Sequence, residues 1–300
     1  MQRIVPNLWF DHKAAEAAAF YTDVFPDARI RETIHYPAEG LPDFQKEFAG
    51  DVLYVEFEIR GYRFIAINAG PDVTVNPSIS FMLNFDPASD PDARAHLDAL
   101  WSALSDGGEA LMPLGEYDFS SHYGWIKDKY GITWQLMLSD SGGASPFIVP
   151  SLLFTEAVQN RAGEAIDYYT SVFGGHVGTV MHYPEDADSA AAGGVMFGDF
   201  ELRGQWFAAM DSGVTHGFTF NFGVSLMVEG ADQTELDTSW SQLNSVPDAE
   251  QCGWCVAKFG VSWQLVPANL AELMSRPGSS ATTHRAPANC LLGRRRSSML

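Results

Sequence analysis

The chain has 300 residues, with 18 Lys and Arg against 38 Asp and Glu, and a formal net charge of −20. A field of this sign repels nucleic-acid phosphates and anionic membrane surfaces, so we expect neither as a partner. There is no apolar run long enough to span a bilayer, no apolar core of a secretory signal at residues 1–7, and too few cysteines (three) for a disulfide framework. These features predict a cytoplasmic protein.

The first 138 residues predict two βαβββ modules. An apolar strand at 7–11 leads into a helix over 14–25, and β-rich segments follow at 29–36, 52–60 and 62–68. Arg60-Gly61 predicts a tight turn between the last two. The same order then recurs, with a strand at 79–85, a helix over 92–104 and strands near 110–117, 123–128 and 132–138. We therefore expect an α+β fold built from paired modules.

The second half of the chain repeats the first. Anchor segments recur in the same order: 20–25 at 168–173, 35–37 at 182–184, 60–61 at 203–204, 101–102 at 240–241, 124–125 at 253–254 and 131–136 at 260–265. Such self-similarity predicts two tandem domains, at 1–139 and 148–274, with a linker at 140–147 and a disordered tail at 275–300. Residues 244–252 replace the longer 107–122, so the second domain is expected to lack about one strand.

Several of these segments resemble the PhnB-like branch of the glyoxalase and bleomycin-resistance superfamily, also called vicinal oxygen chelate proteins. The resemblance is carried by Leu8-Trp9-Phe10, the helix with Phe20-Tyr21, the stretch 111–120, and Gly124-Trp125 followed by 131–136. It implies paired βαβββ modules around a cup that holds a small-molecule ligand, and two domains that form an internal pseudo-dimer. The branch often carries the label 3-demethylubiquinone-9 3-methyltransferase.

Metal enzymes of this superfamily hold a divalent ion with ligands from the first, fourth, fifth and eighth strands. By approximate registration these positions fall at Pro6 or Asn7, Ala66, Ser80 and Gln135, and in the second copy at Pro150 or Ser151, Ala209, Ser225 and Gln264. A divalent ion needs several imidazole or carboxylate donors, and here only an amide recurs. We therefore expect no metal site and predict no cofactor.

Methyl transfer is implied by the family label alone. A nucleotide-like methyl donor is usually bound by a Gly-rich turn after the first strand, and no such turn follows Phe10 or Phe154. Cys252 and Cys255 form a Cys-x-x-Cys pair, but they align with Tyr123 and Ile126, which favours packing over redox or zinc chemistry.

Four residues are candidates for catalysis: His35, Glu56, Asp118 and His122. His35 recurs as His182, each before a Tyr-Pro, where an imidazole is either a general base or a hydrogen-bonding strand end. Asp118 and His122 flank a polar loop that either lies at the rim of the cup or forms a turn. Because the second copy lacks this loop, we expect any pocket to lie in the first domain, built from Glu56, Asp118, His122, Trp134 and Gln135.

The predicted ligand pocket contains Trp9, Trp134, Gln135 and Ser80, although tryptophans on strands are more often packed in a core. Our leading hypothesis is a metal-independent protein that binds, or acts on, a small apolar or cationic molecule. A metal-dependent glyoxalase or dioxygenase, an antibiotic-binding resistance protein and a methyltransferase are the alternatives. The sequence leaves open whether the protein is an enzyme, because one fold hosts many chemistries.

Overall fold

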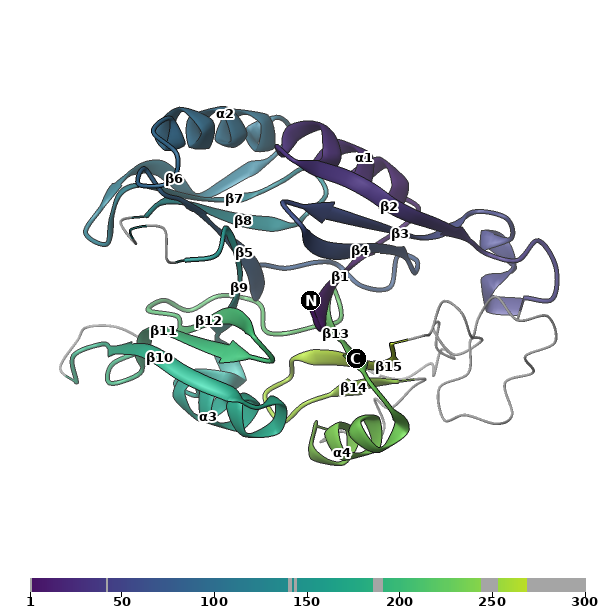
Figure 1. The fold of residues 1–300 in the computed structure, drawn as a ribbon. Helices are drawn as coiled ribbons and strands as arrows, with labels where there is room; N and C mark the ends of the chain where they lie inside the picture. Colours follow the sequence, from purple (N-terminus) through teal and green to yellow (C-terminus); the bar gives the residue numbers. More distant parts are fainter. Residues whose placement is uncertain are drawn as a thin grey trace.

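The computed structural model describes residues 2–41, 43–139, 142, 145–185, 191–243 and 253–268. Within these ranges the first copy of the repeat contains eight strands and two α-helices. Figure 1 shows how they are arranged. Its elements are β1 (Ile4–Phe10), α1 (Ala14–Val24), β2 (Ala28–His35), the 3-10 helix η1 (Asp43–Phe48), β3 (Val52–Ile59), β4 (Tyr62–Asn68), β5 (Ile79–Phe85), α2 (Ala93–Ser105), β6 (Glu109–Tyr117), β7 (Ser120–Lys127) and β8 (Thr133–Leu138).

The second copy repeats this order with one strand fewer in its described part. Its elements are β9 (Ile148–Phe154), the 3-10 helix η2 (Glu156–Val158), α3 (Ala162–Phe173), β10 (Gly175–His182), β11 (Val195–Leu202), β12 (Gln205–Asp211), β13 (Val224–Gly230), α4 (Gln233–Leu243), β14 (Trp254–Val256) and β15 (Ser262–Pro267). The expected α+β fold of repeated βαβββ modules is confirmed. The predicted strand loss falls at 244–252, and the predicted tail at 275–300; both lie outside the described residues.

The strands form two sheets, and each sheet takes one module from each copy. Sheet 1 has seven strands in the order β14-β15-β13-β1-β4-β3-β2, and sheet 2 has eight in the order β10-β11-β12-β9-β5-β8-β7-β6. The copies join where β1 pairs antiparallel with β13, and where β5 pairs antiparallel with β9. Neither copy therefore completes a sheet with its own strands.

Tight turns and helices hold the modules in place. The predicted Arg60-Gly61 turn between β3 and β4 is confirmed, because both residues have positive φ angles (49° and 79°). The equivalent Arg203-Gly204 turn also has two positive φ angles (52° and 80°). Two positive φ angles are typical of the turn that matches strand twist. α1 and α2 lie side by side over one half of the molecule, and α3 and α4 over the other (Figure 1).

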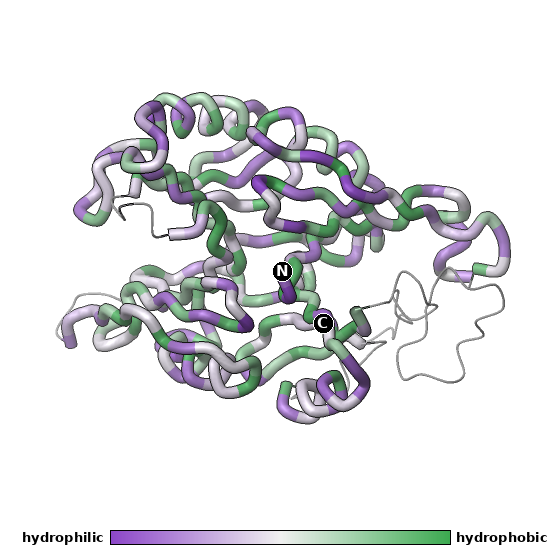
Figure 2. Tube along the Cα trace, viewed as in Figure 1, coloured by the Kyte–Doolittle hydropathy of each residue, from purple (hydrophilic) through white to green (hydrophobic). Residues whose placement is uncertain are grey.

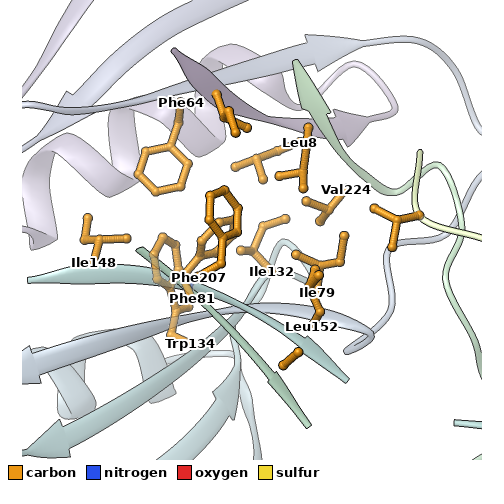
Figure 3. Packing of buried hydrophobic residues seen from close by; sticks show 14 of the residues in the cluster. Leu8, Phe64, Ile79, Phe81, Ile132, Trp134, Ile148, Leu152, Phe207 and Val224 are labelled. Atoms are coloured by element: carbon orange, nitrogen blue, oxygen red, sulfur yellow. The ribbon is translucent and has the colours of Figure 1, made fainter. Parts of the chain in front are cut away.

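One large apolar cluster lies on the helix side of both sheets and joins the two copies. Phe64, Phe81 and Trp134 from the first copy are fully buried and meet Phe207 from the second (Figure 3). The central strands β5, β9 and β13 are mainly apolar and buried on both faces, whereas the edge strand β2 is more polar and exposed (Figure 2). Cys255 belongs to this cluster with its equivalent Ile126, which confirms its packing role; Cys252 is not among the described residues.

A buried carboxylate distinguishes the core of the first copy from that of the second. Asp128 is 2% exposed and accepts hydrogen bonds from the hydroxyl of Tyr21 (2.9 Å) and Nε1 of Trp134 (2.8 Å). Its other oxygen accepts the backbone N–H groups of Tyr130 and Ile132. In the second copy the equivalent residue is Ala257. No described residue gives the equivalent Tyr169 hydroxyl and Trp263 Nε1 a hydrogen bond of good geometry.

Candidate functional site

The candidate site lies on the helix-free face of sheet 2, defined as the face opposite α2 and α3. Gly124 contacts Trp101 of α2, and Gly198 contacts Ile166 of α3, so these two glycines mark the helix-covered face. Successive residues of a strand point to opposite faces. Trp125 on β7 and Asp199 on β11 therefore belong to the helix-free face.

One row of side chains crosses this face through six neighbouring strands. Asp199 pairs with Ala208, Ala208 with Ser151, and Ser151 with Ser80. Gln135 of the next strand reaches Ser80 by a hydrogen bond, and Trp125 pairs with Gln135. We call these six residues the central row of sheet 2: Asp199, Ala208, Ser151, Ser80, Gln135 and Trp125.

A chain of hydrogen bonds fixes the middle of the central row. The hydroxyl of Tyr123 donates to Oε1 of Gln135 over 2.8 Å, and Nε2 of Gln135 donates to Oγ of Ser80 over 2.6 Å. All three residues are buried. Burial raises the pKa of the Tyr123 hydroxyl, so it stays protonated and keeps its role as donor. The amide of Gln135 is thus held in one orientation.

Two buried polar atoms beside this chain lack partners. Ser151 is 1% exposed and its Oγ has no hydrogen-bond partner among the described residues; the same holds for Nε1 of Trp125. An unsatisfied buried polar group costs about 1–3 kcal/mol, so such groups in a native structure need an explanation. A bound ligand with a separate hydrogen-bond acceptor for each group would satisfy both, because three strand spacings of about 4.8 Å separate Ser151 on β9 from Trp125 on β7.

The surroundings of the central row are apolar and partly accessible. Met82, Val149 and Ala208 form a small buried cluster with partly buried neighbours, namely Met137, Phe197, Trp206 and Met210. An apolar lining with a few fixed polar groups is the usual composition of a small-molecule site.

Sheet 1 carries an equivalent row in which more of the groups are already satisfied. Glu56 pairs with Ile65, Ile65 with Asn7, and Asn7 with Ser225. Nε2 of Gln264 donates to Oγ of Ser225 over 2.8 Å, which is the equivalent of the Gln135–Ser80 bond. Asn7 donates to the carbonyl of Val5, and Ile65 stands where sheet 2 has Ala208.

The five residues predicted to form one pocket in the first domain do not come together, so that grouping was wrong. Glu56 lies on sheet 1, while Gln135 lies on sheet 2. Trp134 points to the helix side because it neighbours Gln135 on the same strand, and it is fully buried there. His122 also faces α2, where its Nε2 lies 2.6 Å from Asp98 and its Nδ1 lies 3.2 Å from Arg94.

The remaining candidates are divided between the two sheets. Ser80 and Gln135 are brought together as predicted, but Trp9 lies on sheet 1, where it donates to the carbonyl of Gly70 and meets Trp254 edge-on. Asp118 lies in the exposed β6–β7 turn, and His35 is exposed at the end of β2. Their predicted catalytic roles stay untested.

The structure regroups the eight positions at which metal ligands would be expected. Asn7 shares a sheet with Ser225 and Gln264, and Ser151 shares one with Ser80 and Gln135, so each set mixes the two copies. Ala66 and Ala209 face the helix side instead. Within the described ranges no three His, Cys, Asp or Glu side chains are placed to hold a metal ion, and the hydroxyl and amide donors of the central row do not fit a divalent ion.

Sequence reasoning missed Tyr123, Trp125 and Asp199. The repeat itself contained a signal for Asp199, because its equivalent is Glu56 and the arginines around Glu56 are not repeated. A cavity of about 280 Å³ lies beside the Arg60-Gly61 and Arg203-Gly204 turns. Its Gln2 and Gln205 side chains bond to backbone groups, and its one buried unsatisfied atom among the described residues is the hydroxyl of Tyr62, whereas the central row has two such atoms. No described helix is long and apolar enough to cross a membrane.

The fold is shared with glyoxalase I from Zea mays, which is 13% identical with a TM-score of 0.56; the match covers 90% of this chain and 93% of that one. A putative 3-demethylubiquinone-9 3-methyltransferase, PhnB protein, from Bacillus cereus is 32% identical, with 46% of this chain and 100% of that chain covered and a TM-score of 0.40. A protein from Pseudomonas aeruginosa is 21% identical, with coverages of 47% and 100% and a TM-score of 0.39. The comparison with curated proteins found no match.

The family model described as 3-demethylubiquinone-9 3-methyltransferase matches residues 2–137 and again 146–266. The chain belongs to this family, the PhnB-like branch of the glyoxalase superfamily, in two tandem copies. The predicted family is therefore confirmed.

Proposed function

We propose that the protein binds a small organic molecule on the helix-free face of sheet 2 without a metal ion held by the chain. The observation that carries this proposal is the pair of buried, unsatisfied groups in the central row, Ser151 Oγ and Trp125 Nε1. The Tyr123–Gln135–Ser80 chain beside them is fixed before any ligand arrives. Two oxygens of the ligand, each a carbonyl, ether or hydroxyl oxygen, would accept one hydrogen bond from Ser151 and one from Trp125, while apolar parts of the ligand pack on the lining.

This site replaces the first-domain pocket expected from sequence. The central row takes Ser80, Gln135 and Trp125 from the first copy, and Asp199, Ala208 and Ser151 from the second. The degenerate module of the second copy contributes β13–β15 to sheet 1, and none of its described strands belongs to sheet 2. The shortening at 244–252 thus leaves the eight strands of sheet 2 complete.

Methyl transfer, which the family's description names, has no support in the residues of this site. The segment 11–13 between β1 and α1 reads Asp-His-Lys, and the equivalent 155–161 contains no glycine. A nucleotide-like methyl donor is usually held by a glycine-rich turn at such a position. Binding of a small molecule needs no such turn.

The proposal can be tested with an uncharged fluorescent probe, N-phenyl-1-naphthylamine, titrated into the full chain. We expect Ala208→Ile, which copies Ile65 of sheet 1 into the central row, to weaken binding at least tenfold by filling the space between Asp199 and Ser151. Ser80→Ala should also weaken binding, because it frees the Gln135 amide. Ser225→Ala removes the same kind of bond in sheet 1 and is the matched control.

Equal binding by the wild-type protein and Ala208→Ile, with both folded by circular dichroism, would place the ligand elsewhere. Metal content is measured on the same preparations by elemental analysis before and after dialysis against a chelator. We expect binding to survive chelation; a stoichiometric ion whose removal abolishes probe binding would contradict the metal-independent part of the proposal.

A further inference from the structure

The acidic residues on the helix-free face of sheet 1 are compensated by arginines. Glu56 and Glu58 accept from Arg31 over 3.0 and 2.6 Å, and Glu58 also meets Arg29 at 2.8 Å. Arg63 bridges Glu56 at 2.8 Å and Glu229 at 2.9 Å. Glu56 and Glu58 have little exposed surface, so water solvates their charges poorly. The ion pairs with the arginines compensate these charges instead.

The equivalent carboxylates of sheet 2 have lost these arginines. Asp199 and Glu201 stand at the positions of Glu56 and Glu58, since Asp199 pairs with Ala208 as Glu56 pairs with Ile65. The positions of the three arginines, Arg29, Arg31 and Arg63, are occupied by His176, Gly178 and Trp206. In the described part of the chain no Lys or Arg forms an ion pair with Asp199 or Glu201, and His176 approaches Glu201 only to 4.0 Å.

Two small residues, Ala208 and Gly178, and the ring of Trp206 occupy the region of sheet 2 that corresponds to the arginines of sheet 1. Ala208 is smaller than its equivalent Ile65, and Gly178 leaves the side chains of Asp199 and Trp206 close to each other across it. Trp206 is half-buried and meets His176 edge-on at 5.3 Å. The face of a tryptophan ring attracts cations, most strongly where water is partly excluded.

The unsatisfied Ser151 hydroxyl supplies an independent sign of a ligand in the same row. It is 1% exposed and lies two strands from Asp199, with Ala208 between them. Strands lie about 4.8 Å apart, so the two positions are about 10 Å apart. A molecule that reached both would place one end at the carboxylates and an oxygen acceptor at Ser151.

We propose that the helix-free face of sheet 2 selects an organic cation, whose ammonium group lies between Asp199, Glu201 and the ring of Trp206. The inference rests on the proposed function and adds the chemical class of the ligand. Asp199 already accepts a backbone N–H from Thr179, which fixes its carboxylate in place. Glu201 is 28% exposed, so an ammonium can approach the pair from solvent. The ammonium replaces the positive charge that Arg31 and Arg63 provide in sheet 1.

The test compares three probes that differ in charge at the same length: 4-phenylbutylamine, 4-phenylbutanol and 4-phenylbutyrate, titrated by calorimetry into the full chain at pH 7. We expect the amine to bind at least tenfold more tightly than the alcohol, and the carboxylate to bind more weakly than either. The double variant Asp199→Asn with Glu201→Gln should bring the amine down to the affinity of the alcohol and leave the alcohol unchanged. Glu56→Gln, at the equivalent position of sheet 1, should change neither.

Trp206→Arg gives a second test, should the double variant fold poorly. It copies Arg63 into sheet 2 and places a guanidinium beside both carboxylates, so it should abolish the preference for the amine. Equal binding of the amine and the alcohol by the wild-type protein, with both lost in Ala208→Ile, would overturn the cation preference while leaving the binding face in place. Binding of all probes that is insensitive to Ala208→Ile would overturn the binding face itself.

Discussion

At the scale of single residues, Asp128 shows how much one buried side chain can contribute. It provides four acceptor contacts, to Tyr21, Trp134 and two backbone groups, in a place with almost no solvent. We expect Asp128→Ala to lower the free energy of unfolding by about 3 kcal/mol, because it leaves buried donors unpaired. Urea denaturation followed by tryptophan fluorescence measures the change.

The second copy contains the matched comparison for this change. Ala257→Asp would offer an acceptor to Tyr169 and Trp263, so its effect on the free energy of unfolding should be clearly smaller than the loss at Asp128. A loss for Ala257→Asp as large as that for Asp128→Ala would show that burying a carboxylate destabilises the second core by more than its new hydrogen bonds stabilise it.

The stability that depends on Asp128 should also vary with pH. Burial raises the pKa of the Asp128 carboxyl, and the four donors lower it only in part. A carboxyl whose pKa is raised by folding holds its proton more tightly in the folded state. Its contribution is therefore complete below the ordinary value of about 3.9 and declines as pH rises through the raised pKa. The stability difference between wild type and Asp128→Ala should accordingly shrink with rising pH and then level off; a difference that grows with pH would contradict this.

Several residue-level features could be predicted from the sequence, and others could not. Registration against the ligand-bearing strands of the superfamily placed Ser80 and Gln135 together. Strand alternation forbade Trp134 from joining Gln135, since adjacent strand residues face opposite sides. It could not show that His122 would meet Asp98 and Arg94, because these lie on a helix whose packing is a tertiary property.

At the scale of elements, the first helix of each copy is capped at its N-terminus by a side chain from a strand that is distant in the sequence. Neither α1 nor α3 has a side-chain hydrogen bond from its own capping residue. Instead, Asn68 at the end of β4 accepts the N–H of Ala14, and Asp211 at the end of β12 accepts the N–H of Ala162. This role was not visible in the local sequence, because the partners are about 50 residues apart.

Replacing Asn68 should therefore loosen the first turn of α1. We expect Asn68→Ala to cost about 1–2 kcal/mol, the usual range for a lost helix cap. Hydrogen exchange of the first turn of α1 should accelerate, and that of α3 should not change. Asn68→Asp, which copies the second copy, keeps the acceptor for Ala14 but loses the donation to the carbonyl of Val52, so its effect should be smaller. Unchanged exchange in Asn68→Ala would exclude the capping role.

At the scale of the whole molecule, the sheets determine which parts of the chain can fold alone. The repeat predicted two tandem domains, but it could not show which module pairs with which, because strand order in space is set by long-range contacts. β1 needs β13 and β5 needs β9, so residues 1–139 alone would leave two apolar strand edges unpaired.

We expect the fragment 1–139 to form a symmetric dimer, in which β1 of one molecule pairs with β5 of the other. β5 and β13 occupy equivalent places in the repeat, which makes this exchange possible. Light scattering coupled to size-exclusion chromatography measures the mass, with the 300-residue chain as reference. A folded monomer of the fragment over a range of concentrations would rule out the dependence of each sheet on both copies.

Because each sheet combines one module from each copy, a deletion within one module affects only one of the two sheets. A deletion in the last quarter of the chain acts on sheet 1 alone, although the quarter belongs to the same copy as Ser151 and Asp199. Selection for ligand binding on sheet 2 would preserve the second module of the first copy and the first module of the second copy. The other two modules, which form sheet 1, could accumulate substitutions and keep only a structural role. Divergence between relatives should then follow the faces of the sheets, and not the boundary between the repeats.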